Sequence, residues 1–280
     1  MRRSATLLAL VLLTACSSTS SPPTAQRSTA SPVASPSASL PGPPSPAQTV
    51  ARAVYFLHDD GHGPRLYREF HPRPVTAAVV RDAVTAMLTE APYDRDYTSL
   101  WPHSTAVRGV RISGTTAYVD LSADVVHANA GSAGEAASLQ QLVYTVTAAA
   151  PAVRGVQLLV GGRVVETLWG HVDTRRPLTR AAAWEVLGPV WLLTPPTLKR
   201  GARFGGEASV FEATVSWELR QGSRVVQAGH SNATVGAPGR GPWSAVVDVP
   251  PGSYLLRAWE SSAKDGSQTF VDDKPVTVTG

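Results

Sequence analysis

The chain has 280 residues and a formal net charge of +4, and 43% of its residues are hydrophobic. Residues 1–49 carry three arginines and no acidic residue, whereas residues 50–186 are neutral overall and residues 187–280 have a net charge of +1. Neither later region has the clustered basic stripe that phosphate contacts require, so the composition excludes a nucleic-acid partner.

The chain opens with the parts of an export signal. Arg2 and Arg3 precede an apolar run, Ser4 to Leu13, that is shorter than the roughly twenty residues needed to span a bilayer. The next residues, Leu-Thr-Ala-Cys, end at Cys16 and resemble the lipobox of bacterial lipoproteins. This resemblance implies that residues 1–15 are a signal peptide and that Cys16 is lipidated, with the protein anchored on the outer face of the cell membrane. The alternative is an ordinary signal peptide cleaved near a cysteine.

Cys16 is the only cysteine of the chain, so an internal disulfide or a multi-cysteine metal site is excluded. The residues after it, up to residue 49, are rich in serine and proline and have little to bury in a core. We therefore expect residues 16–49 to form a disordered tether between the lipidated cysteine and the folded part of the protein.

Residues 50–182 predict an α+β domain. Apolar residues at helical spacing, as at Val80, Val84 and Met87, indicate helices, and runs of β-formers beside turn residues indicate strands. The order β-β-α-β-β-α-β-β predicts two layers, with both helices packed on one sheet. The expected elements are strands 53–57 and 65–70, a helix from residue 76, strands 107–112 and 115–122, a helix over 134–149, and a hairpin of 156–160 with 163–167.

Several segments of this region resemble the GerMN domain, which is named from sporulation and spore-germination proteins. They are Val119–Ser122, Leu142–Thr147 and Val153–Gly162, and Pro177–Arg180 sits where such domains end. The resemblance covers roughly residues 50–180. Its motifs consist mainly of packing and turn residues, so it implies a fold and assigns no catalytic group.

Residues 183–280 predict an all-β immunoglobulin-like sandwich of about seven strands. Short runs of β-formers alternate with turns, and no cysteine pair is present, so the core must hold by packing alone. Phe211–Trp217 and Ser262–Ser267 resemble the immunoglobulin-like domain that accompanies GerMN domains in bacterial lipoproteins.

Two groups of residues could carry chemistry in the first domain. His58–His62 brings two imidazoles and two carboxylates together, with His71 nearby, and three or four such groups would have to converge to hold a metal ion. The alternative is a solvated hairpin turn in which Asp and Gly set the backbone conformation. Asp120 lies on a strand face, where it could be functional or could serve as a surface or turn-capping residue.

In the second domain, Ser261 and Lys264 fit the Ser-x-x-Lys pattern of penicillin-recognising enzymes, but no Lys-Thr-Gly element follows them. Tryptophans in and before the sandwich are expected to build its core, although one or two of them could lie exposed and stack on a sugar. They are Trp184, Trp191, Trp217, Trp243 and Trp259.

These observations predict a non-enzymatic, membrane-anchored envelope lipoprotein that binds a protein partner or a cell-wall polymer such as peptidoglycan. They call for no cofactor and no metal, and the family resemblance implies a part in sporulation or germination. One alternative is a cell-wall hydrolase centred on Asp120 or the His58–His62 turn. Another is a solute-binding lipoprotein, which two small dissimilar domains argue against.

Overall fold

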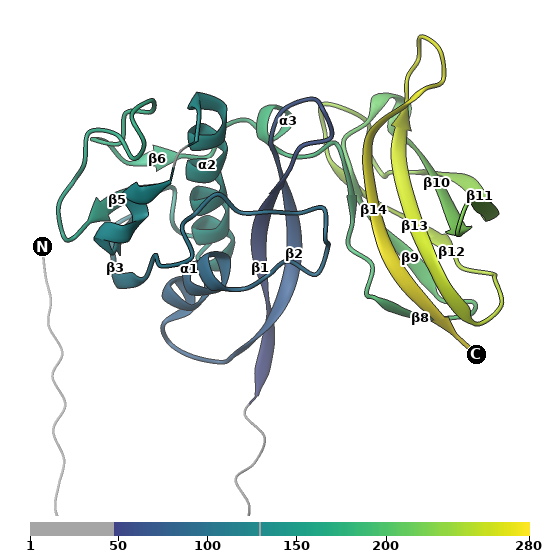
Figure 1. Ribbon diagram of the computed structural model, residues 1–280, viewed down its shortest axis with the longest axis horizontal. Helices are drawn as coiled ribbons and strands as arrows, with labels where there is room; N and C mark the ends of the chain where they lie inside the picture. Colours follow the sequence, from purple (N-terminus) through teal and green to yellow (C-terminus); the bar gives the residue numbers. More distant parts are fainter. Residues whose placement is uncertain (1–47, 129) are drawn as a thin grey trace, which may run out of the picture. The chain divides into compact units, whose positions relative to one another are not determined.

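The computed structural model describes residues 48–128 and 130–280 (Figure 1). The expected signal peptide, the expected lipidation site Cys16 and nearly all of the expected tether lie outside the described residues. Residues 46–280 form one compact unit. Within the described residues, none of the helices combines the length and the apolar character needed to cross a membrane.

The first half of this unit confirms the α+β class and the expected order β-β-α-β-β-α-β-β. A short 3-10 helix, Ala123–His127, precedes the second α-helix. The elements are β1 (Thr49–His58), β2 (Arg65–Pro74), α1 (Val79–Thr89), β3 (Val107–Ser113), β4 (Thr116–Leu121), α2 (Ser132–Ala149), β5 (Gly155–Val160) and β6 (Leu178–Thr179).

The strands form two sheets, and the expectation of one sheet was wrong. β1 and β2 make a long antiparallel hairpin, and the other strands make a sheet in the order β3-β4-β5-β6, with β4 and β5 parallel. The α-helices lie between the hairpin and this sheet (Figure 1). The hairpin does not join the other sheet because α2 covers the outer edge of β1. There the side chains of Gln141 and Thr145 on α2 form hydrogen bonds with the backbone of Tyr55 at 2.7 and 3.4 Å. A helix therefore occupies the place of another strand.

The predicted hairpin of 156–160 with 163–167 was also wrong in its second half. Only a single bridge joins Val160 to Arg163, and the short strand β6 pairs with β5 in its place. The chain after the turn is held by Glu135, a fully buried carboxylate on α2 that accepts the backbone N–H groups of Leu168, Trp169 and His171. Glu135 thus fixes the loop that follows residue 167.

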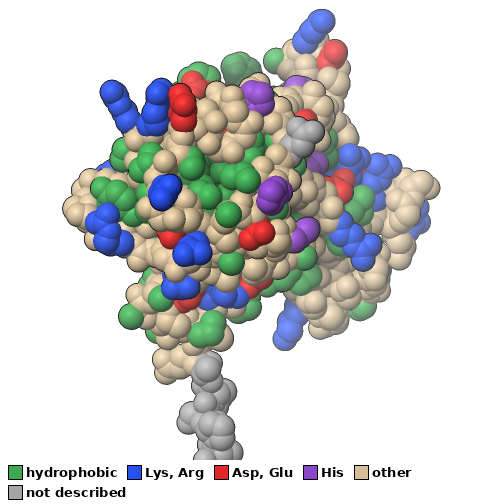
Figure 2. Space-filling view, turned by 60° about the vertical axis from the view of Figure 1, so that its left-hand side comes forward, with side chains coloured by type: hydrophobic (Ala, Val, Ile, Leu, Met, Phe, Trp, Pro, Cys, Tyr) green, Lys and Arg blue, Asp and Glu red, His purple; other side chains and the backbone are tan. Residues whose placement is uncertain are grey.

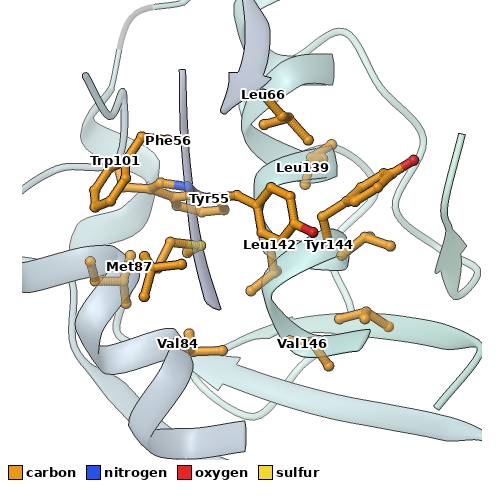
Figure 3. Packing of buried hydrophobic residues seen from close by; sticks show 14 of the residues in the cluster. Tyr55, Phe56, Leu66, Val84, Met87, Trp101, Leu139, Leu142, Tyr144 and Val146 are labelled. Atoms are coloured by element: carbon orange, nitrogen blue, oxygen red, sulfur yellow. The ribbon is translucent and has the colours of Figure 1, made fainter. Parts of the chain in front are cut away.

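The core of this half fills the space around α2 and the hairpin. Figure 3 shows Tyr55 and Phe56 of β1 packed among residues of both helices, including Met87 of α1 and Leu142 of α2. The apolar face predicted for α1 is buried as expected.

The second half confirms the immunoglobulin-like sandwich. Its sheets have the strand orders β11-β10-β13-β14-β8 and β12-β9-β7, and a four-residue helix, α3 (Ala183–Val186), precedes them. The strands are β7 (Val190–Leu192), β8 (Thr197–Lys199), β9 (Arg203–Ala208), β10 (Thr214–Gln221), β11 (Arg224–Asn232), β12 (Gly241–Val246), β13 (Gly252–Ser261) and β14 (Gln268–Thr279).

Strand β9 has the sequence Arg-Phe-Gly-Gly-Glu-Ala, which lacks the run of β-formers from which strands are predicted. Its centre is Gly205-Gly206, and a β-carbon on Gly206 would lie 1.7 Å from the backbone oxygen of Trp191. The strand therefore needs glycine where its neighbours approach closely, although glycine normally weakens a strand pattern.

Candidate functional site

The polar turn at His58–His62 is a structural turn. One carboxylate oxygen of Asp59 accepts the backbone N–H groups of Gly61 and Gly63, both at 2.9 Å. His58 points elsewhere: its Nδ1 lies 3.0 Å from the backbone oxygen of Asp96 and its ring meets the edge of Tyr67. The turn residues thus set the loop conformation, as the solvated-turn interpretation predicts.

His71 does not join this turn. His58 pairs with Arg65 in the hairpin register whereas His71 pairs with Arg52, and six residues of strand separate the two sites by about 20 Å. The buried His71 ring instead lies between Glu69 and Glu90, 2.9 and 2.7 Å away. In the described part of the chain, no group of three or more His, Cys, Asp or Glu side chains is placed to hold a metal ion.

Asp120 caps a turn. Its Oδ1 accepts the backbone N–H of Gly162 at 2.7 Å, and its other oxygen lies 3.5 Å from Nε of Arg108. Gly161 and Gly162 both have positive φ angles, so the carboxylate stabilises a glycine turn directly after β5. This geometry matches the turn-capping alternative.

Ser261 and Lys264, which fit the Ser-x-x-Lys pattern, make separate structural contacts. Ser261 ends β13, and its hydroxyl lies 2.8 Å from that of Ser216, which lies 3.0 Å from Nδ1 of His230. Lys264 belongs to the hairpin loop, where its backbone N–H bonds the Ser262 hydroxyl. The buried Ser216 separates the exposed Ser261 from the imidazole, so the chain of hydroxyls ties neighbouring strands together.

Charged side chains are scattered over the face shown in Figure 2. Lys and Arg appear singly or in small groups among apolar and uncharged atoms, and the histidines are spread out. Trp217 and Trp243 are buried in the sandwich core as predicted, and Trp259 is half-buried. Trp184 departs from the core expectation because 61% of it is exposed.

Trp191 joins the two halves of the unit. It is 1% exposed and belongs to β7 of the sandwich, yet its ring packs in the core of the first half. Its Nε1 donates a 3.1 Å hydrogen bond to the backbone oxygen of Leu66 on β2, and its ring meets the edge of Tyr55. Residues 183–191 thus contact both cores, and the predicted boundary between residues 182 and 183 stays a prediction.

A buried polar cluster lies beside this contact. Lys274 of β14 places Nζ 3.7 Å from Glu69 and 3.5 Å from Asp94, and 4.7 Å from the centre of the Tyr97 ring. The Tyr97 hydroxyl donates a 2.9 Å hydrogen bond to Asp272. Burial raises the pKa of Asp272 to about 7 and also raises the pKa of Asp94. The cluster joins strand β14 of the sandwich to the first half of the unit.

A groove of about 250 Å³ opens next to the cluster, and we name it the junction groove. Phe70 of β2 and Tyr93 line it from the first half, and they are 45% and 58% exposed. Leu192–Pro196 and Pro275 line it from the sandwich. Two exposed aromatic rings thus face an apolar wall that includes three prolines.

Each half of the unit matches a protein-family model. Residues 53–166 match the Germane model, described as sporulation and spore germination. Residues 196–267 match Gmad2, the immunoglobulin-like domain of bacterial spore germination. The chain carries a Germane domain followed by a Gmad2 domain. No curated protein matches it.

Solved structures similar to the chain include two of the sporulation protein GerM from Bacillus subtilis. Its tandem GerMN domains are 15% identical over 72% of this chain and 62% of that chain, with a TM-score of 0.41. Its first GerMN domain is 20% identical over 47% of this chain and 98% of that chain, with a TM-score of 0.40. Murine CRIg is 16% identical over 31% of this chain and 93% of that chain, with a TM-score of 0.19. The Germane and Gmad2 assignments rest on the family models.

Sequence reasoning missed the residues that join the Germane and Gmad2 domains. Tyr97 and Asp272 are 175 positions apart, and neither belongs to a motif. The available signal was weak: Asp272 and Lys274 lie two positions apart in a β-strand, so they share one face, and that face had to meet a polar partner.

Proposed function

We propose that this protein is a membrane-anchored accessory protein of the cell envelope, with a part in sporulation or germination, that binds a protein partner or a cell-wall polymer and catalyses no reaction. The lipobox resemblance at Cys16 supports the anchor, and the Germane and Gmad2 matches support the sporulation or germination role. The anchor would place both domains on the outer face of the membrane.

The observation that carries the binding role is the junction groove. Its exposed rings, Phe70 and Tyr93, sit beside the buried contacts of Trp191 and Lys274 that hold the two domains together. A binding surface on such a support loses little conformational entropy when a partner binds. The sequence candidates for catalysis, Asp120 and His58, each use one polar atom for a backbone contact, to Gly162 and to Asp96.

The test compares the full chain with a double variant, Phe70→Ala with Tyr93→Ala, in crosslinked cells and in sedimentation with purified cell wall. Ile112→Ala is the matched control, since Ile112 is 48% exposed and lies outside the groove. We expect the double variant to lose the crosslinked partner or the wall and the control to retain it. Release of products from purified wall by the wild type, abolished in Asp120→Asn or His58→Ala, would instead make the protein a hydrolase.

A further inference from the structure

The outer edge of β2 presents unpaired backbone groups to the junction groove. In an antiparallel pair, every second pair of opposite residues turns its N–H and C=O groups outward. Tyr55 is such a residue, since its backbone bonds Gln141 and Thr145 of α2. Arg68 lies directly opposite Tyr55. The backbone groups of Arg68 and of Phe70, two residues further, therefore point away from β1.

This edge already binds one extended segment. Leu66, two residues before Arg68, accepts the backbone N–H of Gly188 at 2.9 Å and forms a parallel bridge with Leu187. Beyond Leu66 this edge has no partner strand within the described residues, 48–128 and 130–280. In that part of the chain, no other element forms a hydrogen bond with the backbone of Arg68 or Phe70. The groove thus continues a pairing that the interdomain linker begins.

The charges that line the groove are already paired. Arg68 lies 2.5 Å from Glu207, and Lys274 lies between Glu69 and Asp94. The remaining lining is apolar or aromatic apart from Thr194. An uncharged segment with apolar side chains fits this lining, and an acidic wall polymer would find no free cation there.

Two prolines limit the length of the open edge. Pro72 and Pro74 follow Phe70 at the next outward-facing positions, and proline has no N–H to donate. The stretch from Arg68 to Phe70 is about 7 Å long at the usual rise of a strand. The edge therefore accepts a strand of only a few residues.

We propose that the junction groove binds a short, extended, uncharged segment of a partner protein, which adds as a strand to β2 at Arg68 and Phe70. Its alternate side chains pack against Phe70 on one face and Tyr93 on the other. This inference rests on the proposed binding function and selects a protein partner over a wall polymer.

The test measures fluorescence polarisation of capped, labelled pentapeptides with the full chain. The panel is Ser-Val-Phe-Val-Ser, Ser-Leu-Tyr-Leu-Ser and Ser-Val-Leu-Val-Ser, each also made with an N-methyl group on the central residue or on both of its neighbours. A paired strand turns only alternate N–H groups toward β2, so one methylation pattern should weaken binding roughly tenfold or more and the other should not. Equal binding of both methylated forms and the parent would overturn the proposal, as would no binding by any peptide at about 1 mM.

Two variants of Phe70 distinguish the contribution of its backbone N–H to peptide binding from that of its ring. Phe70→Pro removes both the outward N–H and the ring, whereas Phe70→Ala keeps the N–H; circular dichroism checks that both fold. We expect the proline variant to bind at least tenfold more weakly than the alanine variant, and Ile112→Ala to bind as the wild type does. Equal affinities of the two Phe70 variants, or muropeptide binding that depends on Phe70, would overturn strand addition. If every peptide fails while crosslinked partner capture persists, the inference falls and the binding function stands.

Discussion

Tyr97 and Asp272 join the Germane and Gmad2 domains through a buried hydrogen bond of 2.9 Å. The second carboxylate oxygen of Asp272 accepts the backbone N–H of Leu192 at 2.5 Å. Even with both bonds, burial raises the pKa of Asp272 from its ordinary 3.8 to about 7. The domain contact therefore contains a carboxyl group that changes its charge near neutral pH.

This carboxyl group should make stability depend on pH. Because its pKa is higher in the folded than in the unfolded protein, the folded state binds the proton more strongly, and the Asp272 contribution to the free energy of unfolding falls as the pH rises from about 4 to about 7. We expect Asp272→Asn to remain neutral and to become more stable relative to wild type by about 3 kcal/mol between pH 5 and pH 8. Urea unfolding at both pH values measures the difference.

Asp124→Asn is the control for this experiment, since Asp124 is exposed. Its difference from the wild type should be the same at both pH values. A pH-independent difference for Asp272→Asn as well would show that Asp272 is ionised throughout this range.

Removal of the Trp191 side chain should separate the two domains. Trp191→Ala leaves a cavity in the Germane core and removes the bond to Leu66, so we expect it to cost about 3–5 kcal/mol and to split urea unfolding into two transitions. Trp191→Phe should cost less because it retains a ring. The exposed Trp184 gives the control, with an expected cost for Trp184→Ala within about 0.5 kcal/mol. Similar costs for the two alanine variants would contradict the role of Trp191.

Asp120 should matter for stability alone. Asp120→Ala removes the acceptor for the Gly162 N–H and should lower the free energy of unfolding by about 1 kcal/mol, whereas Asp120→Asn keeps an acceptor and should lower it less. Neither variant should change product release from purified cell wall. The idea fails if the wild type digests wall and Asp120→Asn does not.

Cys16 should carry the lipid. Cys16→Ala should abolish incorporation of radiolabelled fatty acid and block normal processing, because the thiol is the attachment point in the lipobox resemblance. Ser17→Ala, one residue further, should still be labelled. Full labelling of Cys16→Ala would rule out this anchor.

Local patterns predicted much of the fold. The helical spacing of Val80, Val84 and Met87 correctly predicted α1, because all three residues lie on one face of the helix and are buried in the same core. The predicted strand over 163–167 did not form, and the backbone just after it is bound by Glu135, a residue of another element. A sequence pattern records how a segment distributes its own apolar residues and does not record which distant side chain satisfies its backbone.

Sequence patterns could not predict the junction groove either, because its lining comes from segments that are far apart in the sequence. Phe70 and Tyr93 look like ordinary apolar residues in the sequence, and their importance arises where Leu192–Pro196 comes to lie opposite them. By contrast, the turn-capping alternative for Asp120 needed only its position on a strand face, and the structure supports it, although the capped residue, Gly162, is 42 positions away.

The two prolines at the end of β2 have a consequence for protein molecules crowded on a membrane. Lipid anchors would confine many copies to a plane, where an open strand edge on one copy could pair with the same edge on its neighbour and start aggregation. Pro72 and Pro74 withhold the N–H groups that a longer sheet would need. The edge of β2 therefore stays usable for a few residues of a partner while growth of a sheet from molecule to molecule is blocked.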